Sequence, residues 1–288
     1  MWATDRFYRC AGVGIRVRCT HADFGARVES LLGAFAVPAA DRGDPTASEL
    51  CYSLVAAAPP ARPGQRNYHF LYREILRQAR TTGANALIAA LADDLLVMLP
   101  GLRPDQYALR AGVVTRHDHA VLLLGASQAM TERLAAAFGA HGYEYAGPLL
   151  FVDPSARSWS PCPLPLPRRG DSEDMEPEEF VAVGTASETA WPLGTVRTIV
   201  VEAERVEPET MDGYTDQAVA PLSRAHAVLA LVRRSANFHD RAAERPALAR
   251  DLLGRAACFT IRRARTAARQ RDVDDDDSMA AAVARALV

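Results

Sequence analysis

The sequence contains no lysine: all 33 of its basic residues are arginines. Chemistry that depends on lysine is therefore excluded, which covers Schiff bases, lysine general bases and the lysine of phosphate-binding loops. Alanine is abundant, with 54 residues. Because the codons of both alanine and arginine are rich in G and C, a high-GC bacterial genome accounts for the bias. The absence of lysine still limits what any site in this chain can do.

Other features are also scarce. The five cysteines are scattered without a CxxC or a Cys/His ligand spacing, which predicts reduced thiols, a cytoplasmic protein and no metal site. The N-terminus lacks a long apolar segment and we find no run of about 18 apolar residues, so we expect no signal peptide and no membrane span. A net charge of −2 gives no reason to expect a nucleic-acid or membrane partner.

The length of 288 residues and the 49% apolar content are enough for one large domain or two ordinary ones with a sizeable core. Strand patterns alternate with helix patterns along the chain, which predicts an α/β fold with a mixed sheet in the second half. We place the boundary near residue 100, with a smaller N-terminal α/β region at 1–100 and the main core at 101–288.

In the first half, the apolar spacing and the Pro and Gly punctuation predict four structured segments. They are a strand or hairpin over 6–20, a helix over 21–35, a strand over 49–58, and a helical stretch over 68–92 that Gly83 divides. Residues 94–100 either continue this helix or form a strand.

In the second half, residues 108–125 predict a strand, a turn at His117–Asp118 and a second strand whose apolar run 120–124 suits a central position. The proline-rich and then acidic segment 153–180, with Trp159, predicts a long surface loop or a partly disordered insertion, which acts as a docking segment, a lid or a passive linker. The other expected elements are helices over 131–138, 221–234, 245–257 and 278–287 and strands near 148–152 and 195–203.

One stretch has the framework of a phosphate-binding loop. Residues 121–138, VLLLGASQAMTERLAAAF, predict a hydrophobic strand, a turn at Gly125 and a helix. In the pattern G-x-x-x-x-G-K-[ST], backbone N–H groups and the helix N-terminus bind phosphate, the lysine binds the β and γ oxygens, and the Ser or Thr binds magnesium. Aligned on Gly125, the other defining positions are Met130, Thr131 and Glu132. Only the first glycine fits, so this stretch alone is a weak signal.

The order of several such patterns resembles the HPr kinase-related family. Its members carry a phosphate-binding loop after a hairpin that reads LHAGAV, a turn and AVLLLG, and here ALRAGVV, a His-Asp turn and AVLLLGAS follow that pattern. The segments LAAAFGAHGYEYAGPLLFVD (with Gly142 matching), TVRTIVVEAERVEP, APLSRAHAVLALVRRSANF and ACFTIRRARTAAR resemble later family elements. The resemblance covers most of 66–271 and implies an HPr-kinase-like α/β fold, with a P-loop-derived mixed sheet core and helices.

The positions that carry the family's chemistry are the ones that differ. Arg110 stands where the family has a histidine before the hairpin, and no carboxylate stands at 146–148, where the resemblance places an acidic pair. Thr131 replaces the lysine, and Glu132 replaces the magnesium-binding hydroxyl. Two like charges ~4 Å apart at an effective dielectric of about 20 repel by about 4 kcal/mol. Glu132 thus disfavours a γ-phosphate, and can itself cap the helix start. We predict a degenerate loop and no nucleotide cofactor.

The candidate site residues surround this loop, and each has an ordinary structural alternative. Arg110 binds an anion or forms a surface salt bridge, the two turn histidines move protons or are merely solvated, and the loop hydroxyls bind a ligand or cap the helix. The candidates for ligand binding are Arg110, Gly125, Ser127, Gln128, Thr131, Arg133 and Glu144, and those for catalysis are Glu132, His117 and His119.

Three functions remain open at this point. The first is a pseudo-kinase, an accessory protein that binds a peptide or protein partner; the resemblance implies a role in bacterial peptide natural-product biosynthesis, since relatives occur beside peptide-modifying enzymes. The second is a diverged enzyme that reuses the cleft for non-phosphoryl chemistry on a small biosynthetic intermediate. The third is an ATP-dependent kinase with a non-standard loop.

Overall fold

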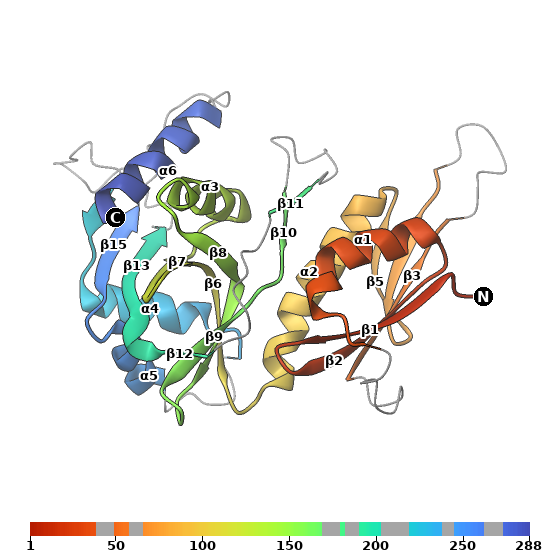
Figure 1. The fold of residues 1–288 in the computed structure, drawn as a ribbon, viewed down its shortest axis with the longest axis horizontal. Helices are drawn as coiled ribbons and strands as arrows, with labels where there is room; N and C mark the ends of the chain where they lie inside the picture. Colours follow the sequence, from red (N-terminus) through yellow and green to blue (C-terminus); the bar gives the residue numbers. More distant parts are fainter. Residues whose placement is uncertain are drawn as a thin grey trace, which may run out of the picture. The chain divides into compact units, whose positions relative to one another are not determined.

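The structure is a computed structural model that describes residues 1–38, 49–57, 66–168, 179–181, 190–202, 219–237, 245–261 and 273–288. It divides into two compact units, residues 1–102 with 167–181 and residues 103–166 with 182–288 (Figure 1). Each unit has its own helices and its own sheet with both parallel and antiparallel strand pairs. The expected α/β class with a mixed sheet is therefore confirmed.

The first unit is a five-stranded sheet in the order β1-β2-β3-β4-β5. Two helices pack on one of its faces, since Tyr52 donates a hydrogen bond to Asp94 at 2.7 Å and the ring of Phe24 contacts His69. The elements are β1 (Thr4–Cys10), β2 (Val13–Cys19), α1 (Ala22–Leu32), β3 (Leu50–Val55), β4 (His69–Arg73), β5 (Leu76–Thr81) and α2 (Ala84–Met98). A short two-stranded sheet of β10 (Leu166–Arg168) and β11 (Glu179–Val181) also belongs to the structure.

The helix predicted over the first part of 68–92 is wrong. Residues 69–81 form an antiparallel hairpin, β4 and β5, whose register pairs His69 with Thr81. The apolar residues fit helical spacing by coincidence: Ile75, 89% exposed, lies at the hairpin tip, whereas Leu71 is fully buried. Short apolar runs cannot separate strand from helix by periodicity alone. The helical prediction holds only after Gly83, where α2 also extends through the ambiguous residues 94–98.

One helical stretch within the described residues, Ala84–Leu102, is long and apolar enough to cross a membrane by length and composition alone. Its buried side chains, among them Leu87, Ile88 and Leu91, belong to the core of the first unit. That packing is typical of the core helix of a globular domain.

The second unit is an eight-stranded sheet in the order β12-β9-β8-β6-β7-β13-β15-β14. Strand β7 (His119–Leu124) lies near its centre, antiparallel to β6 (Tyr107–Arg116) and parallel to β13 (Val196–Glu202). Residues 120–124 are buried, which confirms the predicted central strand and the turn at His117–Asp118. The remaining strands are β8 (Glu144–Asp153), β9 (Ser158–Cys162), β12 (Trp191–Pro192), β14 (Val219–Pro221) and β15 (Ala257–Ile261).

Helices cover both faces of this sheet (Figure 1). On one face, α4 (Arg224–Arg234) and α5 (Arg245–Leu253) complete a core that includes Leu122, Leu124 and Leu231. On the other face, α3 (Gln128–Gly139) packs against β6, β8 and α6 (Val273–Leu287). The carboxyl ends of the parallel strands β7, β13 and β15 therefore lie together at one edge, between two layers of helices.

The long surface loop predicted over 153–180 is also wrong in its first part. Residues 158–162 form strand β9, which pairs with β8. Trp159 is buried and stacks on Trp191 with ring centroids 5.5 Å apart. Proline is tolerated in strands that lie towards the edge of a sheet, so the proline-rich sequence hid a strand. Residues 169–178, which hold most of the acidic run, lie outside the described residues.

Candidate functional site

The connection between β7 and α3 is a tight turn rather than an extended loop. Gly125 has a φ of +77°, a conformation that favours glycine. Only Ala126 and Ser127 separate it from α3, which begins at Gln128. The Ser127 hydroxyl accepts a hydrogen bond from the N–H of Met130 at 3.2 Å, as the capping alternative predicted. The helix thus occupies positions that a phosphate-binding loop would leave open.

A carboxylate from the neighbouring strand already binds this turn. The backbone N–H of Ser127 donates to Oε2 of Glu202, the last residue of β13, at 3.0 Å. An anion at a helix N-terminus is stabilised by the unpaired N–H groups and the helix dipole. We expected Glu132 at the helix start, but Glu202 lies there instead. The position that suits a phosphate oxygen is held by a side chain of the protein itself.

A prediction follows for Glu202. Replacing it by glutamine removes the charge but keeps an acceptor, so Glu202→Gln should lower the free energy of unfolding by about 1 kcal/mol. Urea denaturation monitored by circular dichroism measures this difference. Glu144→Gln is the matched control, since Glu144 is exposed and should change stability by less than about 0.5 kcal/mol. Equal effects of the two substitutions would contradict a specific role for Glu202.

The basic side chain nearest the turn is Arg234. Its Nη2 lies 3.2 Å from the position that a Cβ on Gly125 would take. Arg234 is in the last turn of α4, and the following residue, Ser235, bridges to Leu109 of β6. Arg110, the cation that we expected here, is an exposed residue of β6 that pairs with β8.

The two positions that precede Glu132 pack in the core. Met130 is fully buried and Thr131 is 6% exposed. The Thr131 methyl group lies 2.5 Å from the position that a Cβ on Gly112 would occupy. We expected the Thr131 hydroxyl to bind a ligand or cap the helix, but Thr131 is buried, because α3 starts early enough to turn this residue onto the sheet. Gln128 and Arg133 are partly exposed on the same helix.

Glu132 belongs to a buried polar cluster with Tyr145 and Cys162. The Tyr145 side chain is 5% exposed, and its hydroxyl has no hydrogen-bond partner among the described residues. Burial raises the pKa of Tyr145 well above its usual value, and the negative charges of Glu132 and then Cys162 raise this pKa further. Oε1 of Glu132 is buried as well. This is a confined group of titratable side chains beneath α3.

The cluster gives a second prediction. Tyr145→Phe removes a buried hydroxyl without a partner, so it should raise the free energy of unfolding by about 1 kcal/mol. The pKa of Tyr145 is raised on folding, so above pH 10 the unfolded chain releases the phenol proton while the folded chain keeps it, and stability falls as the pH rises. The wild type should therefore lose stability above about pH 10 more steeply than the variant. Denaturation curves at pH 8 and pH 10.5 measure both effects, and a destabilised variant would contradict the structure.

Three of the candidate residues lie away from the turn between β7 and α3. His117 and His119 flank the exposed β6–β7 turn, where His119 Nε2 is 3.8 Å from Asp118. Glu144 pairs across the sheet with Thr115, near the same turn. At ~3.3 Å per residue, the length of β7 separates His119 from Gly125 by about 20 Å. The structure therefore does not bring the two histidines and Glu144 together with the N-terminus of α3.

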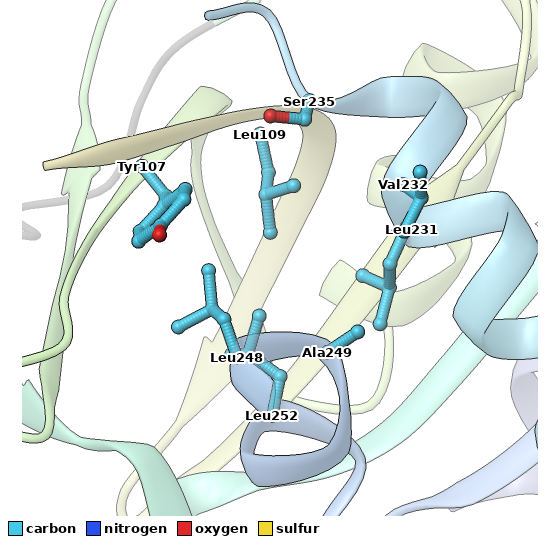
Figure 2. A pocket seen from close by; sticks show the side chains of 8 residues that line it. All are labelled: Tyr107, Leu109, Leu231, Val232, Ser235, Leu248, Ala249 and Leu252. Atoms are coloured by element: carbon cyan, nitrogen blue, oxygen red, sulfur yellow. The ribbon is translucent and has the colours of Figure 1, made fainter. Parts of the chain in front are cut away.

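Figure 2 shows a small apolar pocket on the face opposite α3. Side chains from β6, α4 and α5 point toward one another around it. The cavity volume is ≈10 Å³, about the space of one water molecule. The lining residues are Tyr107, Leu109, Leu231, Val232, Ser235, Leu248, Ala249 and Leu252. The pocket is too small to hold a substrate as it stands.

Within the described part of the chain, no three His, Cys, Asp or Glu side chains gather in an arrangement that could hold a metal ion. No protein-family model matches the chain. A search of curated proteins likewise finds no match.

Sequence reasoning missed four residues of this site: Glu202, Arg234, Tyr145 and Cys162. A signal existed for Glu202, because ligands of open α/β sheets bind at the carboxyl ends of parallel strands and Glu202 ends the apolar run TIVV. No comparable signal existed for Arg234 or Tyr145, since their positions depend on how α4 and β8 meet the central strands.

Proposed function

We propose that this chain is a cytoplasmic, HPr-kinase-like protein that no longer transfers phosphate and acts as an accessory or binding protein. The observation that carries the proposal is the hydrogen bond from the Ser127 N–H to the Glu202 carboxylate. A phosphate oxygen would need the same N–H group and the same helix end. The protein's own anion competes with any nucleotide at this point.

Charge supports the same conclusion. Phosphoryl transfer needs cations and a metal to offset the phosphate charge. Here Thr131 is buried in place of the lysine, and the Glu202 carboxylate lies at the helix start. A carboxylate ~4 Å from a phosphate would cost about 4 kcal/mol before screening. The Arg234 guanidinium lies beside Gly125, and a single arginine offsets one negative charge at most.

The partner class follows from the resemblance to the HPr kinase-related family. Members of that family occur beside peptide-modifying enzymes. Their occurrence there supports a binding partner from specialised metabolism, which is a peptide, a protein or a small biosynthetic intermediate. A protein that keeps the fold but loses the phosphate site retains its exposed surfaces for such partners.

A second candidate function is a diverged biosynthetic enzyme, favoured by the buried Glu132–Tyr145–Cys162 cluster. Buried titratable groups that perturb one another are typical of catalytic sites. In this function Glu132 moves a proton within the buried surroundings that it shares with Tyr145 and Cys162. Glu132→Gln should then abolish the pathway product while the fold is retained, and Glu144→Gln should not. Unchanged product with Glu132→Gln would rule this function out.

The first candidate function, a binding protein without kinase activity, is tested by an assay of phosphoryl transfer. The purified chain is incubated with γ-labelled ATP and magnesium, alone and with the peptide products of its genomic neighbourhood. We expect no label on protein or peptide and no release of ADP above background. Transfer that depends on Glu132 would instead establish the kinase with a non-standard loop.

A further inference from the structure

The five-stranded sheet of the first unit has one face that α1 and α2 do not cover. Side chains alternate between the faces of a strand. The helix-facing set includes Tyr8, Ile15 and Tyr52, which are at most 1% exposed. The opposite set carries five arginines together with aromatic rings. We call it the arginine face; its members are Arg9, Arg16, Arg18, Arg77, Arg80, Phe7, Phe70 and Tyr72.

Strand register joins these residues into continuous rows. One row runs across all five strands, and two shorter rows flank it. The rows are Asp5–Arg18–Ser53–Tyr72–Arg77, Phe7–Arg16–Cys51 and Val55–Phe70–Arg80. Each row therefore pairs an arginine with an aromatic ring on a neighbouring strand, although these residues come from segments far apart in the sequence.

Three of these guanidinium groups lie over aromatic rings at distances typical of cation–π contacts. Arg16 lies 5.2 Å from the centre of the Phe7 ring, and Arg80 lies 3.6 Å from that of Tyr68. Arg18 lies 4.8 Å from the centre of the Trp2 ring, which is 38% exposed. Arginine planes and aromatic planes thus form a mixed surface on which further flat groups can stack.

Among the described residues, few acidic groups balance this charge. Asp5 pairs with Arg16 at 2.6 Å. At the rim, Glu49 and Glu74 accept hydrogen bonds from the backbone N–H groups of Gly14 and Cys51. Five arginines against these three carboxylates leave the face positive, although the whole chain carries −2. The expectation of no nucleic-acid partner rested on the whole-chain charge, which hides this local excess.

We propose that the arginine face binds single-stranded nucleic acid. Arginines can neutralise successive phosphates, and bases stack on aromatic rings and on guanidinium planes. An acidic polypeptide would also match the charge, but it has no flat groups for Phe70 and Tyr72, whose ring centroids are 6.2 Å apart on β4. The rings favour a nucleic acid. This surface is independent of the α3 site and of the proposed function.

The test is fluorescence anisotropy of the full chain with a labelled 12-nucleotide oligo(dT), at 50 and 200 mM salt. We expect saturable binding that weakens with salt. The double variant Arg77→Ser, Arg80→Ser should bind about tenfold more weakly at low salt and reduce the salt slope by about 1.4, because two phosphate contacts are lost. Arg77→Ser alone should show about half of this slope change, which keeps the test decisive if the double variant fails to fold.

Two controls separate stacking and charge from other effects. Arg250→Ser with Arg285→Ser removes the same charge from exposed positions of the second unit and should leave the affinity unchanged. Tyr72→Phe should keep the affinity, whereas Tyr72→Leu should weaken it about tenfold. The proposal is overturned if the wild type shows no saturable binding at 50 mM salt, or if the Arg250/Arg285 variant loses as much affinity as the Arg77/Arg80 variant. A 12-residue glutamate peptide that binds as tightly as oligo(dT) would overturn it in favour of an acidic polypeptide.

Discussion

Gly147→Ala should leave little folded protein. Gly147 lies in β8 with a φ of +134°, which residues with a side chain rarely adopt. An added Cβ would lie 2.0 Å from the carbonyl oxygen of Cys162 and 2.8 Å from its carbonyl carbon. Both obstacles are backbone atoms of the neighbouring strand β9, so no side chain can turn away. We expect a loss of at least about 4 kcal/mol, a large part of the stability of an ordinary domain.

Thermal and urea denaturation with circular dichroism measure this loss. The matched control is Gly139→Ala at the end of α3, where nothing lies within 4 Å of an added Cβ. The control should be neutral or stabilise the fold by up to about 1 kcal/mol. A Gly147→Ala variant as stable as wild type would show that β8 and β9 do not approach each other in this way.

Thr131→Lys should also be strongly destabilising, and it should not restore nucleotide binding. The substitution supplies the lysine that the HPr kinase-related family carries at this position. Because Thr131 is 6% exposed and its methyl group packs over Gly112, the longer chain meets the sheet and its ammonium group loses water. We expect a loss of about 3 kcal/mol or more.

Two controls distinguish burial from charge. Thr131→Val keeps the shape of the side chain but removes its hydroxyl, so it should cost no more than about 1.5 kcal/mol, the usual net contribution of one hydrogen bond. Gln128→Lys adds the same charge in the first turn of α3, at a partly exposed position, and should cost at most about 1 kcal/mol. A stable Thr131→Lys variant that gains ATP affinity would mean that α3 starts later than Gln128 and that the loop is open.

The sequence alone predicted the secondary structure correctly where the apolar pattern was long and bounded by turn residues. The hairpin of β6 and β7 and the central position of residues 120–124 followed directly from such a pattern. It failed for β4 and β5, where apolar residues on a short hairpin imitated a helix, and for β9, where prolines hid a strand. In both cases the secondary structure depends on pairing with neighbouring strands, which a local sequence pattern does not reveal.

In the candidate site, too, local features were predictable from the sequence and contacts from distant segments were not. Ser127 was predictable as a cap, because its position before the helix and its hydroxyl are local features. Glu202 and Arg234 reach the turn from elements far along the chain. The arginine face could not be predicted either, because its members come from different strands and the whole-chain charge carries the opposite sign.

The central claim is that the turn after β7 no longer binds nucleotide phosphate, because Glu202 and the early start of α3 occupy that position. Isothermal titration calorimetry of the wild-type chain with ATP and magnesium tests this most directly. We predict no heat of binding up to millimolar ATP. A saturable isotherm in the micromolar range that is strengthened on Glu202→Gln would contradict it.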